Sequence, residues 1–105
     1  MDESEFERQA GAMLSRIEAA LEACDADIDF ELAAAGVLEI EFADGSKIIV
    51  NRHAAAREIW VAARSGGFHY RYADGLWVDT RSDEELLAAL AKLVGAQAGK
   101  AVSLG

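Results

Sequence analysis

The sequence predicts an α+β fold, a two-layer sandwich in which an N-terminal and a C-terminal helix pack on one face of a roughly six-stranded antiparallel sheet. Apolar residues recur with helical spacing only near the two ends of the chain. Between these ends apolar and polar residues alternate, as in strands with one buried face. Turn signals separate the alternating segments without intervening helices, so a parallel βαβ arrangement is excluded.

The first helix is expected from about Glu5 to Cys24. Ser4 and Glu7 have the spacing of a capping box at its start. The apolar stripe that would face the core then follows the helical period: Phe6, Ala10, Met13, Leu14, Ile17, Leu21 and Cys24. Because Cys24 falls on this stripe, we expect a buried and unreactive thiol.

The period changes from 3.6 to 2 before Ile28, which predicts strands. Segments 28–32 and 37–42 alternate apolar residues with acids, and a small-residue turn at 33–36 joins them. Asp44 and Gly45 predict a two-residue turn into a strand at 47–51. Further strands are expected at 58–64, 68–72 and 76–79, with turns at 65–67 and at Asp74–Gly75.

The last helix is expected to begin after a second capping box, formed by Ser82 and Glu85, and to end near Gly95. Leucines and a valine then repeat at helical spacing. With this helix the chain of 105 residues forms one domain, residues 1–105.

Composition excludes several classes of protein. The 52% hydrophobic content excludes a disordered chain, and the single cysteine excludes an internal disulfide and favours a reducing compartment. The acidic start MDESEFERQ is unlike a signal peptide, and no apolar run approaches the roughly 18 residues that span a bilayer. We therefore expect a cytoplasmic protein, a monomer by default, without a membrane partner.

The net charge of −9 is concentrated near the N-terminus. Residues 1–31 hold ten acidic and two basic side chains, a net charge of −8. This distribution argues against nucleic-acid binding and favours cations or a basic protein partner. On the first helix the pairs Glu3–Glu7 and Glu18–Glu22 are four residues apart, a spacing at which like charges repel.

Asp25, Asp27, Asp29 and Glu31 continue these acids and are candidate metal ligands together with the four helix glutamates. They do not form an EF-hand loop, because Phe30 stands where glycine is required. Alternate strand acids lie about 6.5–7 Å apart, so only a shallow, hydrated, weak site for a hard cation is expected. The alternative is a solvated charged face.

Trp60 alternates with Ile59 and Val61 and is expected on the wet face of the sheet, as an anchor for a binding partner or as an ordinary strand residue under partial cover. Trp77 is a weaker candidate. The two histidines lack the spacing of a transition-metal site, and no nucleophile elbow or phosphate loop is present. The sequence therefore predicts no catalytic residues and no enzyme.

In this order of elements the chain resembles the frataxin family in its bacterial form, over essentially all 105 residues. The stretches that carry the resemblance are SEFERQA, DADIDFE, GVLEIEFADGSKIIVNR, EIWVAARSGGFHYRY, GLWVDTRS and AVSL.

The resemblance implies a role in iron–sulfur cluster assembly, with weak binding of ferrous and ferric iron and modulation of the cysteine desulfurase. The iron ligands it implies form an acidic ridge, with Glu3 and Glu7 as outliers: Glu18, Glu22, Asp25, Asp27, Asp29 and Glu31. It further implies a surface that contacts the iron–sulfur scaffold protein and the desulfurase: Trp60, Asn51, Glu39 and Glu41.

Ala19 and Ala23 depart from the family pattern, since bacterial relatives carry further acids there. Fewer carboxylates imply fewer or weaker iron sites. Two alternatives stay open: a regulator that docks on the desulfurase through its acids without physiological iron, and a ferroxidase-like enzyme. Iron-dependent oligomers are an open alternative to the default monomer.

Overall fold

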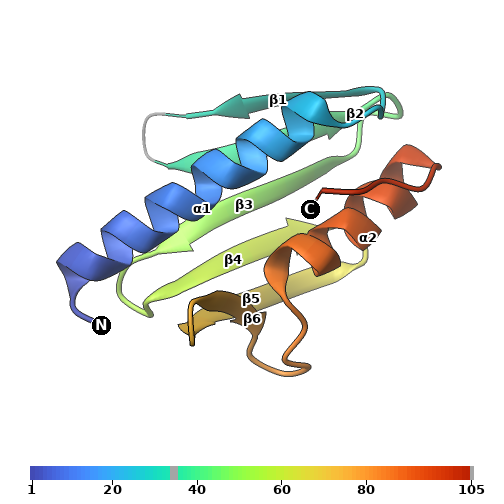
Figure 1. Ribbon diagram of the computed structural model, residues 1–105. Helices are drawn as coiled ribbons and strands as arrows, with labels where there is room; N and C mark the ends of the chain where they lie inside the picture. The colour runs from blue at the N-terminus through green and yellow to red at the C-terminus, as the bar shows by residue number, and fades with distance from the viewer. Residues whose placement is uncertain (34–35, 105) are drawn as a thin grey trace.

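The computed structural model describes residues 1–33 and 36–104, and within them the chain forms two helices and six strands (Figure 1). The elements follow in the order α1 (Glu3–Ala23), β1 (Ile28–Leu32), β2 (Val37–Phe42), β3 (Lys47–His53), β4 (Glu58–Ala63), β5 (Gly66–Ala73), β6 (Leu76–Asp79) and α2 (Leu86–Ala98). Each strand pairs antiparallel with the next, so the sheet order is β1-β2-β3-β4-β5-β6. The α+β sandwich expected from the sequence is confirmed.

Both helices lie on one face of the sheet and leave the other face open (Figure 1). α1 crosses the β1–β3 side and α2 lies over the β4–β6 side, and the chain after α2 runs back between them. Leu104 in this last segment is buried in the core. No helix within the described residues is long and apolar enough to cross a membrane.

The core follows the alternation expected from the sequence. In β2, Leu38, Ile40 and Phe42 are buried under the helices while the two glutamates between them are exposed. The alternation of buried and exposed residues is less complete in β1, where Leu32 is 37% exposed. β1 is an edge strand, and α1 runs diagonally away from its end (Figure 1). Cys24, which caps α1, is half-buried against the core rather than fully buried.

Both expected capping boxes were wrong. α1 begins at Glu3 because Asp2 caps it, with its Oδ1 accepting from Glu5 N at 2.8 Å. Asp caps a helix as well as Ser does and adds a negative charge at the positive end of the dipole. In α2 the cap is Glu85, whose carboxylate accepts from the backbone N–H groups of the first turn. Glu85 also forms a β-bridge with Val78, which delays the helix.

α2 ends at Ala98, and Gly99 caps it with a φ of 75°. The expected end at Gly95 was therefore early. Gly95 is helical, and a Cβ there would lie 3.0 Å from the Lys100 carbonyl oxygen. Glycine at position 95 therefore allows the chain after α2 to pack closely against the helix, and it does not end the helix.

The two Ala-Asp-Gly triplets form different turns. Asp74 and Gly75 have φ values of 52° and 82° and join β5 to β6 as the expected two-residue turn. The connection between β2 and β3 instead takes four residues, 43–46. The turn expected at 65–67 was also misplaced, since β5 already begins at Gly66. The turn expected at 33–36 lies partly outside the described residues.

Candidate functional site

Four carboxylates gather on the open face of the sheet where β1 pairs with β2. Asp29 lies opposite Glu41, and Glu31 lies opposite Glu39. We call these four exposed residues the acid quartet. Directly opposed side chains have Cβ atoms about 4.5–5.5 Å apart, and successive acids of one strand about 6.5–7 Å. Like charges in this arrangement repel, so a cation or a basic partner would relieve the repulsion.

Lys47 on β3 neutralises part of the acid quartet. Its Nζ lies 2.8 Å from Glu39 Oε1, and this ion pair, with Glu41 nearby, raises the pKa of the Lys47 ammonium. Within the described residues no ion pair involves Asp29, Glu31 or Glu41. The quartet therefore keeps most of its negative charge.

The other ridge acids lie on α1 and on the segment between α1 and β1. Glu18 is half-buried on α1, while Glu22, Asp25 and Asp27 are exposed. Lys100 Nζ lies 3.3 Å from Asp25 Oδ2 and donates to the Asp25 carbonyl oxygen at 2.9 Å. Among residues 1–33 and 36–104, no group of three or more Asp, Glu, His or Cys side chains is placed to hold a metal ion. The ridge is thus a spread of single and paired carboxylates rather than a preformed cage.

Glu3 and Glu7 lie at the far end of α1 from these acids. Glu7 and Glu22 are fifteen residues apart in one helix, which corresponds to about 22 Å. Glu7 Oε2 lies 3.2 Å from Arg52 Nη1 of β3. This contact joins α1 to the sheet, and it gives Glu7 a structural partner that the sequence did not indicate.

Trp60 lies on the open face of β4, as its alternation predicts, and is half-buried there. Its indole is stacked between two imidazoles, with ring centroids 3.9 Å from His53 and 4.5 Å from His69. Its Nε1 donates to Glu58 Oε1 at 2.8 Å. Asn51 is the direct cross-strand neighbour of Trp60. We call these five residues the tryptophan patch.

Alternation along β4 places Glu58 on the face of Trp60, but the positions of His53 and His69 beside the indole were not predicted from the sequence. The strand register would have revealed them. Trp60 lies opposite Asn51 on β3 and His69 on β5, and residues two positions from these in the same strand share the face of Trp60. The stack holds the indole in one orientation. Trp77, by contrast, is buried and packs edge-on against Phe6, so it belongs to the core.

The fold and the two surfaces define a class: an open-faced α+β sandwich that presents an acid quartet and an oriented tryptophan on one uncovered sheet face. A family model described as a frataxin-like domain matches residues 1–100. The chain belongs to the frataxin family.

Relatives match along nearly the whole chain. A protein of Dechloromonas aromatica named iron-sulfur cluster assembly protein CyaY is 64% identical over 104 residues, which cover 99% of both chains. A protein of the same name from Cupriavidus pinatubonensis is 55% identical and covers 100% of this chain and 97% of its own.

Solved structures agree with the fold. The frataxin of Psychromonas ingrahamii has a TM-score of 0.91 at 32% identity, over 100% of this chain and 99% of its own. Yeast frataxin has a TM-score of 0.65 at 22% identity, over 90% of this chain and 80% of its own, which is a likeness of fold.

Proposed function

We propose that this protein acts in iron–sulfur cluster assembly, binding ferrous and ferric iron weakly on its acidic ridge and modulating the cysteine desulfurase. Membership of the frataxin family and the names of the relatives support the assembly role. The role proposed is binding and regulation, without catalysis.

The observation that carries the iron proposal is the opposition of like charges across β1 and β2. Asp29 and Glu41 can approach one cation from two strands, which acids on one strand cannot do. Carboxylate oxygens suit hard cations, and the exposure of these side chains leaves the ion partly hydrated. The binding is therefore weak and reversible, as a protein that delivers or senses iron requires.

The tryptophan patch supports a second part of the proposal, contact with the iron–sulfur scaffold protein. An oriented, half-buried indole beside Asn51 and an acidic neighbour is the kind of anchor that dominates protein interfaces. The acid quartet lies on the same open face, so the protein can engage a basic enzyme surface and the scaffold together.

A second candidate function is docking on the desulfurase through the acids without physiological iron. It is favoured by the lack of any group of three metal-ligating side chains in the part of the chain that the structure describes. Partner binding that depends strongly on salt and not on metal would support this candidate. Saturable, catalytic iron oxidation would instead support a ferroxidase.

The first test is an anaerobic amide NMR titration with Fe²⁺, repeated in excess Mg²⁺. We expect line broadening confined to residues 18–31 and 39–41 that persists with Mg²⁺. Broadening that Mg²⁺ abolishes, or that spreads over all exposed acids, would overturn selective iron binding and leave the docking function.

The ridge itself is tested by Asp25→Asn combined with Asp27→Asn. We expect this variant to bind Fe²⁺ and purified cysteine desulfurase more weakly, because two negative charges are lost. Folding should be preserved, since the Asp25 side chain is 99% exposed and its pair with Lys100 contributes little. Asp74→Asn with Asp83→Asn is the matched control, and equal affinities in both variants would remove Asp25 and Asp27 from the site.

A further inference from the structure

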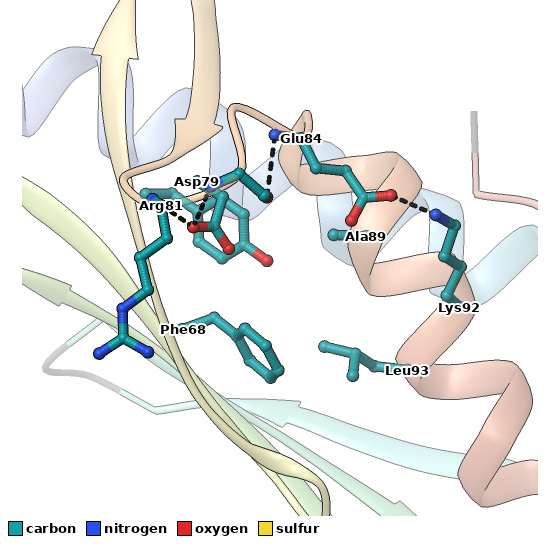
Figure 2. Close-up of a pocket in the computed structure, with 9 residues that line it drawn as sticks. Phe68, Asp79, Arg81, Glu84, Ala89, Lys92 and Leu93 are labelled. Atoms are coloured by element: carbon teal, nitrogen blue, oxygen red, sulfur yellow. Dashed lines mark hydrogen bonds and ion pairs between the residues drawn. The ribbon is translucent and has the colours of Figure 1, made fainter.

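A cavity of about 270 Å³ opens between β5, the end of β6, the segment that follows it and α2 (Figure 2). It lies at the opposite edge of the sheet from the acid quartet. Its volume is slightly below the roughly 300–1,000 Å³ typical of sites for drug-sized ligands, so it suits a smaller molecule. None of the proposed iron or partner residues lines it.

One side of the cavity is apolar. Phe68 of β5 faces Leu93 of α2 across the opening, with Ala89 one turn earlier on the helix (Figure 2). This wall offers a hydrocarbon surface to a ligand but no hydrogen bond.

The inner end of the cavity is polar and incompletely paired. Tyr70, which lines the cavity, is fully buried, and its hydroxyl has no hydrogen-bond partner. Asp79 is 7% exposed, and its Oδ1 accepts from Arg81 N at 2.7 Å and from Ser82 N at 3.2 Å. Asp79 Oδ2 accepts no hydrogen bond from the described residues. The Tyr70 hydroxyl is closed off from solvent, so the unpaired group that a ligand in the cavity can reach is Asp79 Oδ2.

The charge around this inner end is negative. Burial, together with the charges of Asp79, Glu84 and Glu85, raises the pKa of the Tyr70 phenol. Arg81 does not cancel this field, because its guanidinium points away from Glu84 and α2 (Figure 2). The group that fits beside Tyr70 and Asp79 is therefore a cation that donates hydrogen bonds.

The ion pair of Lys92 with Glu84 shows that a primary ammonium group fits at the mouth of the cavity. The Lys92 ammonium pairs with Glu84 Oε2, although the Lys92 side chain is 74% exposed. An exposed pair of this kind contributes little stability, so a competing ammonium ion can displace it.

We propose that this cavity binds a small aliphatic primary ammonium ion. The ammonium donates to Asp79 Oδ2 and to Glu84, and the hydrocarbon lies between Phe68 and Leu93. Because none of these residues belongs to the acidic ridge or the tryptophan patch, this site is independent of the proposed iron and partner functions.

The test is an amide NMR titration of the full chain with 3-methylbutylammonium, using 3-methylbutan-1-ol as the uncharged control. We expect shifts confined to residues around the cavity for the ammonium ion, with at least about tenfold weaker binding of the alcohol, because a hydrogen bond to a charged group is lost. Equal binding of both probes would overturn ammonium recognition. Shifts spread over the acid quartet, or no shifts at all, would leave a cavity that holds water only.

Three variants locate the ion. Glu84→Gln should weaken binding about tenfold, because a hydrogen bond to a charged group is lost. Lys92→Gln should strengthen binding, because it removes the competing ammonium. Lys47→Gln makes the same charge change at the acid quartet and should leave the affinity unchanged. If Lys92→Gln and Lys47→Gln have equal effects, the attraction is only the net charge of the protein and the proposal fails.

Discussion

Asp44 accepts three hydrogen bonds in the connection between β2 and β3. Ser46 N and Ser46 Oγ donate to its Oδ1 at 2.9 and 2.6 Å, and Arg64 Nη1 donates to its Oδ2 at 3.0 Å. These bonds, chiefly those from Ser46, lower the pKa of the carboxyl from 3.8 to about 2. They also explain why this Ala-Asp-Gly triplet forms a wider turn than the one at Asp74.

The lowered pKa of Asp44 predicts a contribution to stability that depends on pH. Because the pKa is lower in the folded than in the unfolded chain, the contribution is complete above about pH 4 and is lost as the pH falls toward 2. Urea unfolding between pH 5 and 2 should therefore show a shallower loss of stability in Asp44→Asn than in the parent chain. Asp74→Asn removes a carboxylate from the other turn as a control. Equal pH slopes in the parent and Asp44→Asn would contradict the prediction.

The sequence predicted the tryptophan patch only in part, for a reason that belongs to single residues. Alternation within β4 placed Trp60 on the open face, and this was confirmed. The imidazoles that stack on it come from β3 and β5, and their positions depend on the register between strands. Register depends on turn length, and the turn lengths predicted from the sequence were wrong at two turns, 43–46 and 65–67.

At the scale of elements, Arg52 joins three parts of the fold. Its guanidinium contacts Glu7 of α1 and lies against Gly36 at the entry to β2. Gly36 has a φ of 79°, and a Cβ there would lie 2.6 Å from Arg52 Nε. Backbone conformation and space both require glycine at this position.

Gly36→Ala should therefore lower the free energy of unfolding by about 1–3 kcal/mol, through strain at positive φ and displacement of Arg52. Gly67→Ala is the matched control, because a Cβ at Gly67 meets no atom within 4 Å and no positive φ is involved. That variant should stay within about 0.5 kcal/mol of the parent. Chemical denaturation of the two variants makes the comparison, and a similar loss in both would show that space around Gly36 is not limiting.

The elements themselves were predictable because periodicity is a local signal, and helices and strands were all found from it. Their ends were less predictable because several good caps compete within a few residues. Ser4 and Asp2 are both suitable caps for α1, and the structure uses Asp2. At α2, the bridge between Val78 and Glu85 decided the start, and that contact is tertiary.

At the scale of the whole molecule, the pairing of β1 with β2 determines where the negative charge acts. From the sequence, Asp29 and Glu31 were assigned to the ridge and Glu39 and Glu41 to the partner surface, and hairpin pairing of the two strands was expected to put their acidic faces side by side. The structure brings all four together on one face. A single surface thus offers its charge both to a cation and to a basic protein, which connects the iron and docking hypotheses physically.

This shared charge predicts an opposition between stability and binding. Asp29→Asn with Glu31→Gln removes one partner from each cross-strand pair and should raise the free energy of unfolding by about 0.5–1 kcal/mol at low salt. The gain should shrink above about 0.15 M salt, because the exposed charges are then screened. The same variant should bind Fe²⁺ and the desulfurase more weakly.

Asp74→Asn with Asp83→Asn separates this local effect from net charge. It removes the same two charges from positions of positive φ, where Asn is well tolerated, and far from the quartet. Urea unfolding in low and high salt, together with the two binding assays, compares the variants. If both variants gain equal stability, the repulsion is global rather than cross-strand. If the quartet variant gains stability but binds Fe²⁺ and the desulfurase as tightly as the parent, the acid quartet binds neither ligand. The proposed site would then no longer include the acids of β1 and β2.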